Sequence, residues 1–132
     1  MEDIVYREEI LEHYKTPLNF GKPDKFAISS RQTNPFCGDE IEMFVEFEEK
    51  SAGGATIPPQ GWKIKTIGFE GVGCVISIVA GSMLTDYAKG KTKKELTKFS
   101  QEDMLDLLGI EVSETRKKCA LLAFSVLKEC LV

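Results

Sequence analysis

Hydrophobic and charged residues alternate along residues 40–48, which gives the clearest strand signal in the chain. The apolar face carries Ile41, Met43, Val45 and Phe47, and the opposite face carries four glutamates, with Phe44 as the one exception. A period of two places successive side chains on opposite faces, so we expect an antiparallel strand with one face in the core. Residues 62–69 repeat the pattern through Ile64 and Ile67, and residues 27–33 predict a weaker edge strand.

Glycine and proline mark the connections between these elements. Residues 51–61 contain three Gly and two Pro and predict a flexible connection between two strands. Residues 3–15 place apolar residues at helical spacing. That helix should end at Thr16, because the residue before a proline is disfavoured in helical backbone.

Helical periodicity dominates after Cys74. One apolar stripe comprises Ile76, Val79, Ala80, Met83, Leu84 and Tyr87, and Gly90 is placed to close this helix. Residues 92–95 and 100–103 read as capping boxes that each open a short helix. The last helix should run from near Ser113 almost to Val132, with Leu122, Ala123, Val126 and Leu127 facing inward. These elements predict an α+β fold, in which a small three-stranded antiparallel sheet packs against about five helices in one domain over residues 1–132.

The composition is that of a soluble globular protein, with 42% hydrophobic and 29% charged residues among 132. A formal net charge of −4 argues against a nucleic-acid binder, and the basic run at residues 116–118 is too short to change that. The charged N-terminal residues lack the apolar stretch of a signal peptide, and no apolar run approaches the roughly 20 residues of a membrane span. We therefore expect a cytoplasmic protein with reduced thiols and no membrane partner.

Four cysteines are dispersed along the chain: Cys37, Cys74, Cys119 and Cys130. In a reducing compartment such cysteines serve as metal ligands, reactive thiols or buried core residues more often than as disulfides. Cys37 and Asp39 flank Gly38, and in extended backbone residues i and i+2 project to the same side. The thiolate and the carboxylate can therefore face one point; the alternative is a buried cysteine beside a turn aspartate.

Cys74 and Cys119 both lie where a thiolate is favoured. Cys74 precedes an apolar helix, whose free N–H groups and macrodipole attract negative charge. The alternative for Cys74 is a small hydrophobic residue that opens a core helix. Cys119 follows three basic residues near the start of the last helix. The pattern leaves open whether Cys119 points into the core or toward Cys74.

Cys130 and His13 do not fit this site. Cys130 lies eleven residues beyond Cys119, which is roughly 16 Å along one helix, so the two cannot share a metal ion. We interpret Cys130 as a packing residue. His13 is the single histidine, which excludes His-rich zinc sites and gives little support to a Ser-His-Asp triad.

Three thiolates and one carboxylate fit two inorganic occupants. Zinc would take Cys37, Asp39, Cys74 and Cys119 as a tetrahedral site, and a [2Fe–2S] cluster could use two of them on each iron. A purely structural site would more naturally use four cysteines. A carboxylate is a more exchangeable ligand than a thiolate for such metals. Asp39 therefore indicates a site whose metal or sulfur content is exchanged.

Four stretches, in order along most of the chain, resemble the U-type iron–sulfur scaffold family of IscU, SufU and the N-terminal domain of NifU. Residues 12–21 (EHYKTPLNFG) resemble HY-x-x-P-x-N-x-G, residues 34–39 (NPFCGD) resemble P-x-C-G-D, residues 71–77 (GVGCVIS) resemble G-x-G-C-x-I/A-S, and residues 118–120 (KCA) resemble the third cysteine. The resemblance implies a SufE/NifU-like (IscU-like) fold with Cys37, Asp39, Cys74 and Cys119 clustered at one end. It also implies a cysteine desulfurase that delivers persulfide sulfur, a transient [2Fe–2S] cluster, and acceptor proteins.

The chain also departs from the family's branches. The cluster-scaffold branch has a histidine where this chain has Lys118, and a Leu-Pro-Pro-Val-Lys chaperone-recognition segment where this chain has residues 110–114 (IEVSE). Lys118 and residues 77–83 resemble the SufU branch, whose members bind zinc and accept persulfide sulfur. This chain lacks the insertion that SufU proteins usually carry between the second and third cysteines.

The resemblance supports two functions. The first is a non-enzymatic scaffold that receives sulfur from a desulfurase, binds iron and a labile [2Fe–2S] cluster, and passes the cluster on. In it, Cys119 is expected to accept the sulfur and Lys118 to activate its thiolate. The second is a zinc-dependent sulfurtransferase with the same ligands, in which one cysteine leaves the zinc. A structural zinc domain is a third interpretation, and Asp39 counts against it.

Overall fold

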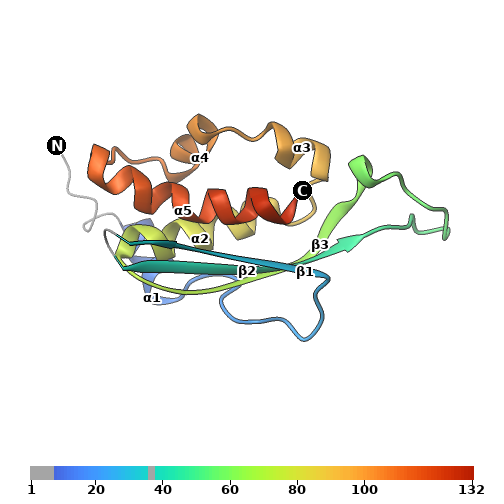
Figure 1. The fold of residues 1–132 in the computed structure, drawn as a ribbon, viewed down its shortest axis with the longest axis horizontal. Helices are drawn as coiled ribbons and strands as arrows, with labels where there is room; N and C mark the ends of the chain where they lie inside the picture. Colours follow the sequence, from blue (N-terminus) through green and yellow to red (C-terminus); the bar gives the residue numbers. More distant parts are fainter. Residues whose placement is uncertain (1–7, 36–37) are drawn as a thin grey trace.

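Three antiparallel strands form one sheet in the order β1-β2-β3: β1 (Ile28–Asn34), β2 (Asp39–Glu48) and β3 (Lys63–Val72). The computed structural model describes residues 8–35 and 38–132. Asn34 pairs with Asp39, and Glu40 pairs with Val72. The start of β2 and the end of β3 therefore share one end of the sheet, at the left of Figure 1.

The strand predictions are confirmed in type and pairing, and the largest difference in extent is at the end of β3. β3 continues to Val72, three residues beyond the predicted end at Phe69, because the first residues of β2 provide backbone partners for it. Phe44 is buried although it lies on the glutamate face, since its ring packs edge-on against Phe26 at 5.1 Å. Residues before β1 thus cover that part of the outer face.

Five α-helices occur in the described residues, together with the short 3-10 helix η2 (Pro59–Gly61). They are α1 (Glu8–Lys15), α2 (Val75–Ala88), α3 (Lys93–Lys98), α4 (Gln101–Leu108) and α5 (Glu114–Cys130). The predicted first helix is confirmed from residue 8 onward, and residues 3–7 lie outside the described residues. Both capping boxes are confirmed, at Thr92–Glu95 and Ser100–Asp103. None of the described helices is long and apolar enough to cross a bilayer.

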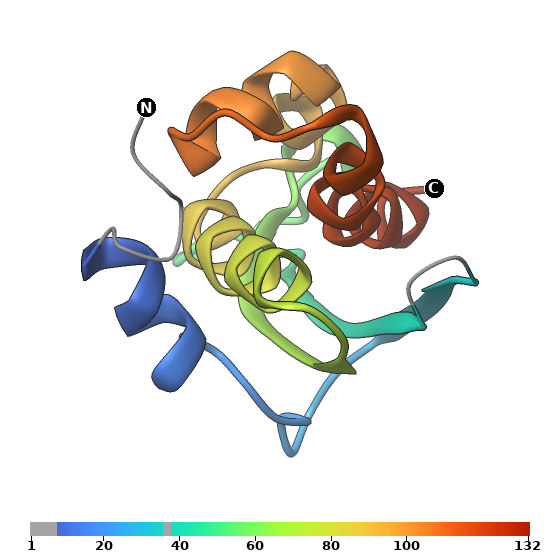
Figure 2. The same cartoon turned by 90° about the vertical axis from the view of Figure 1, so that its left-hand side faces the viewer.

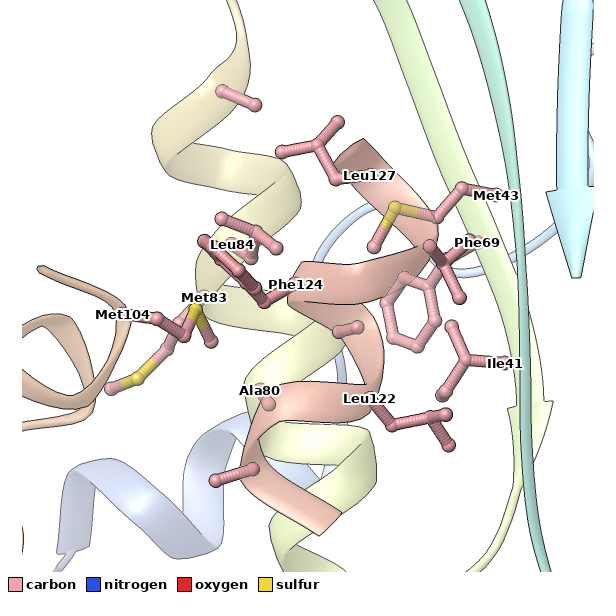
Figure 3. Packing of buried hydrophobic residues seen from close by; sticks show 14 of the residues in the cluster. Ile41, Met43, Phe69, Ala80, Met83, Leu84, Met104, Leu122, Phe124 and Leu127 are labelled. Atoms are coloured by element: carbon pink, nitrogen blue, oxygen red, sulfur yellow. The ribbon is translucent and has the colours of Figure 1, made fainter. Parts of the chain in front are cut away.

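Helices α2 and α5 lie on one face of the sheet, and α3 and α4 lie beyond them (Figure 1). Figure 2 shows α2 between α1 and α5. Figure 3 shows the core that results, with side chains from the sheet and both central helices: Ile41, Met43, Phe69, Ala80, Leu84, Leu122 and Leu127. The predicted inward positions of the last helix are all buried. This packing fixes the N-terminal ends of α2 and α5 relative to the sheet.

Helix α2 is buried on nearly every side, not along one stripe. Tyr87, predicted to face inward, is 37% exposed and packs its ring against Phe99 at the edge of the core. Ser82 and Thr85 are fully buried instead. The single stripe was therefore wrong for Tyr87 and too narrow for this helix, because a central helix meets neighbours on several sides.

The segment around α1 explains these buried hydroxyls. Ser82 Oγ lies 2.6 Å from His13 Nδ1 and accepts a hydrogen bond from the backbone N–H of Leu18 at 2.8 Å. The Asn19 side-chain amide donates to Thr85 Oγ1 at 3.1 Å. The stretch that resembles the family's N-terminal motif thus holds α1 and the following loop against α2, and His13 has a structural role in this arrangement.

Candidate metal centre

Three of the four predicted ligands meet at one end of the fold. Atoms of Asp39, Cys74 and Cys119 that can bind a metal all lie within 4.8 Å of one another. Asp39 begins β2, Cys74 is the N-cap of α2, and Cys119 lies in the second turn of α5. The Cys119 side chain points toward Cys74 and Asp39, which the sequence pattern left open. Cys37 lies outside the described residues.

Asp39 is the centre of the hydrogen-bond network in this cluster. Its Oδ1 accepts the backbone N–H of Cys74 at 3.0 Å, and its Oδ2 accepts the hydroxyl of Ser77 at 2.7 Å. Burial raises the pKa of Asp39, but hydrogen bonds from Cys119, Ser77 and Cys74 outweigh it and hold the pKa below the ordinary 3.8. The carboxylate is 1% exposed, so it is a buried anion at neutral pH and can serve as a ligand.

Two glycines with positive φ lie beside Asp39: Gly38 precedes it in the chain, and Gly73 makes room for its carboxylate. Gly38 has φ 71° and donates its N–H to the Asn34 carbonyl at 2.9 Å, which closes the turn between β1 and β2. Gly73 has φ 147°, and a Cβ there would meet Asp39 atoms at no more than 3.0 Å. Asp39 can reach the N-terminal end of α2 only because residue 73 has no side chain.

Replacing Gly73 with alanine is expected to lower the free energy of unfolding by about 3 kcal/mol or more, since backbone strain and a steric clash add together. Asp39 would also be displaced from the cluster. Denaturant unfolding and zinc affinity measure the two effects. Gly21→Ala is the matched control, because Gly21 also has a positive φ (117°) but nothing within 4 Å of the added Cβ. Equal losses in both variants would contradict the steric argument.

Two residues of the site had no predicted role. Ser77 is fully buried in the first turn of α2, and its hydroxyl lies 3.8 Å from Cys74 Sγ as well as bonding to Asp39. Asn34 is buried at the end of β1, and its side-chain amide points at Cys119 Sγ at 3.8 Å. In the sequence, Ser77 was marked as the last residue of the stretch 71–77 (GVGCVIS) and by its place three residues, about one helical turn, after Cys74.

A surface groove of about 520 Å³ borders the site between β1 and α5. Asn34 and Lys118 line it, together with Lys117, Leu121 and Leu122. Because Asn34 also contacts Cys119, the groove reaches the edge of the ligand cluster. Lys118, predicted to activate the Cys119 thiolate, thus borders the approach to that residue.

Cys130 lies in the last turn of α5, well away from the ligand cluster, as predicted. It is 1% exposed, and burial, with a smaller contribution from the Glu129 charge, raises its pKa to about 12. Cys74, Cys119 and Cys130 are all free thiols. Cys130 is therefore a buried packing residue with almost no thiolate at neutral pH.

Iodoacetamide at pH 8 is expected to alkylate half-buried Cys74 in the metal-free protein and to leave Cys130 unmodified until the chain unfolds. A rise in pKa from 9.0 to about 12 lowers the thiolate fraction by about a thousandfold. Mass spectrometry of digested peptides measures the rate at each cysteine, with a urea-unfolded sample as the control. Labelling of native Cys130 at the rate of Cys74 would contradict this prediction.

The donor set suits a thiophilic metal. Two sulfur atoms and a carboxylate oxygen are ligands that zinc and iron–sulfur clusters both accept, and hard cations such as magnesium prefer oxygen alone. The three candidate ligands in the described residues come from separate elements that the core packing fixes in place. The residues present therefore fit either occupant, with Cys37 as the predicted fourth ligand.

Comparison with known proteins supports this architecture. The chain is 27% identical to the iron–sulfur cluster assembly scaffold protein IscU 1 of Archaeoglobus fulgidus, over 97% of this chain and 75% of that protein. It is 30% identical to the zinc-dependent sulfurtransferase SufU of Bacillus subtilis, over 96% and 89%. The SufU alignment spans 144 positions, more than the 132 residues of this chain, so SufU carries residues without a counterpart here.

Solved structures agree on the fold. A putative iron–sulfur cluster assembly scaffold protein for the SUF system from Fervidobacterium islandicum superposes with a TM-score of 0.76 and 25% identity, covering 97% of both chains. The profile of the NifU-like N-terminal domain matches residues 5–132. The resemblance and the α+β prediction are confirmed, and the chain belongs to the NifU-like N-terminal domain family.

Proposed function

We propose that this protein is an iron–sulfur cluster assembly scaffold that accepts persulfide sulfur from a cysteine desulfurase and hands a labile [2Fe–2S] cluster to acceptor proteins in the cytoplasm. One observation carries the proposal: the buried carboxylate of Asp39 lies within 4.8 Å of the thiols of Cys74 and Cys119, which belong to different helices. A carboxylate beside thiols gives a site that can bind a cluster and also release it. Relatives named as scaffold proteins match nearly the whole chain.

The chemistry assigned to Cys119 is thiol–persulfide exchange. The Cys119 thiolate attacks the outer sulfur of the desulfurase persulfide, a new S–S bond forms on Cys119, and the desulfurase cysteine leaves as a thiolate. Electrons and charge balance without an oxidant. Conversion of the transferred sulfur to sulfide then requires an external two-electron reductant. The groove beside Asn34 and Lys118 offers room for the incoming persulfide-bearing segment.

A zinc-dependent sulfurtransferase is the second candidate. The 30% identity to SufU and the presence of Lys118 favour it, and the same Cys37, Asp39, Cys74 and Cys119 would hold the zinc. In that function one cysteine must leave the metal to take the sulfur. The protein would then pass sulfur, not clusters, to its partner.

Metal and acid-labile sulfide content separates the two candidates. The protein is purified without oxygen and assayed before and after incubation with a cysteine desulfurase, cysteine, ferrous iron and a reductant. A cluster that replaces weakly held metal and moves to an apo-ferredoxin supports the scaffold. Zinc at one equivalent that persists through the incubation supports the sulfurtransferase and contradicts the scaffold.

A further inference from the structure

We infer that Ser77 is a positioning residue that stabilises the Asp39 carboxylate in its metal-free position. Ser77 would thereby speed the release of a bound metal ion or cluster from the site. This inference rests on the proposed function, because it concerns how the site releases its metal ion or cluster. Ser77 would then set the exchange rate of a ligand without binding the metal itself.

Both oxygens of Asp39 have a hydrogen-bond donor on α2. The Cys74 backbone N–H serves Oδ1 at 3.0 Å, and the Ser77 hydroxyl serves Oδ2 at 2.7 Å. Ser77 is 0% exposed, so bulk water cannot substitute for its hydroxyl. The carboxylate also faces the positive end of the α2 macrodipole. Both oxygens of the Asp39 carboxylate are therefore hydrogen-bonded when no metal is bound.

Within residues 8–35 and 38–132, the other donors to Asp39 are the thiols of Cys119 and Cys74. A thiol must lose its proton to bind a metal, so these hydrogen bonds disappear once the site is loaded. The Ser77 hydroxyl and the Cys74 N–H keep their protons in every state. These two donors would remain available to the Asp39 carboxylate if it left the metal while the thiolates stayed bound.

A hydrogen bond to a free carboxylate is stronger than one to a metal-bound carboxylate, because the metal withdraws part of the charge that attracts the donor. Ser77 therefore lowers the free energy of the dissociated Asp39 more than that of the bound one. Removing the hydroxyl should make dissociation less favourable. The opposite effect follows if Ser77 only orients Asp39 toward the metal, since loss of such support weakens metal binding.

Zinc transfer to a chromophoric chelator tests whether the Ser77 hydroxyl speeds or slows the release of the metal. Protein loaded with one equivalent of zinc is mixed with excess chelator, and the release rate is followed by stopped-flow absorbance. We expect Ser77→Ala to release zinc about threefold to tenfold more slowly than the unmodified protein, as a fraction of one charged hydrogen bond. Ser82→Ala is the matched control, because Ser82 is equally buried in α2 but contacts His13 and Leu18.

Two further comparisons isolate the hydroxyl. Ser77→Thr and Ser77→Val have the same shape and differ only in the hydroxyl, so the valine variant should release zinc more slowly than the threonine variant. In an Asp39→Ala background, Ser77→Ala should have no further effect. The melting temperature of each metal-free variant confirms folding, and the threonine–valine pair keeps the test valid if the alanine variant does not fold.

Equal or faster release from Ser77→Ala, or from the valine variant relative to the threonine variant, would overturn the inference. In that case the proposed scaffold function would still stand if the unmodified protein assembles a labile cluster that replaces the zinc. If the unmodified protein takes up neither zinc nor a cluster, both the proposed function and this inference are overturned.

Discussion

Replacing Asp39 with alanine is expected to slow cluster transfer to an acceptor by about tenfold or more, a change of about 1.4 kcal/mol in the barrier. The variant should still bind the cluster, because three thiolates remain available from the predicted set of Cys37, Cys74 and Cys119. The carboxylate is the ligand that exchanges most readily, so its loss removes the easiest route by which an acceptor thiolate enters. A site without Asp39 should retain its cluster longer.

Transfer to apo-ferredoxin, followed by circular dichroism in the visible range, measures this rate. Glu40→Ala is the matched control: Glu40 is the adjacent carboxylate in β2, it pairs with exposed Arg31 at 3.4 Å, and it lies on the opposite face of the strand. Its removal should leave the transfer rate unchanged. If Asp39→Ala loses its metal entirely, Asp39 is an anchoring ligand and its role in release has been misjudged.

The same substitution should also reduce the stability of the metal-free protein by about 1–3 kcal/mol. Asp39 accepts hydrogen bonds from the Cys74 backbone and from buried Ser77, and its removal leaves both donors unsatisfied. The melting temperature of the metal-free form therefore separates this structural cost from the effect on release.

Sequence alone predicted the elements whose signals are local. Thr92 and Ser100 are the N-caps of α3 and α4, and each N-cap side chain accepts an N–H from the third residue of its helix. The alternation along β2 also identified the strand face that packs in the core, because alternation is a local signal too. The end of β3 was missed because Gly71 suggests a turn, whereas pairing with Ile41 extends the strand. That pairing is a long-range property.

The candidate ligands could also be proposed from the sequence, but their arrangement in space could not. Cys74 and Asp39 each had a local chemical argument. The direction of Cys119 depends on how α5 packs against α2 and the sheet, which no local pattern specifies. The contact of Ser77 with Asp39 joins residues 38 positions apart, and that of Asn34 with Cys119 joins residues 85 apart. Side chains that support a site from such distances leave almost no signal in one sequence.

Replacing Cys119 with serine is expected to abolish persulfide uptake from a desulfurase. A serine hydroxyl is not ionised at neutral pH and cannot form the S–S bond that holds the transferred sulfur. The substitution changes one buried atom, so the fold should persist. Mass spectrometry of the protein after incubation with a desulfurase and cysteine, before any reduction, detects the gain of one sulfur atom and its position.

Cys130→Ser is the matched control for this experiment. Cys130 lies in the same helix and is as buried as Cys119, but its pKa is raised and it lies away from Asp39. Its replacement should leave persulfide uptake unchanged. If Cys119→Ser still gains sulfur at Cys37 or Cys74, then the acceptor is the thiol that gains it. The groove beside Asn34 would then lead past Cys119 to the acceptor, and Cys119 would serve as a ligand only.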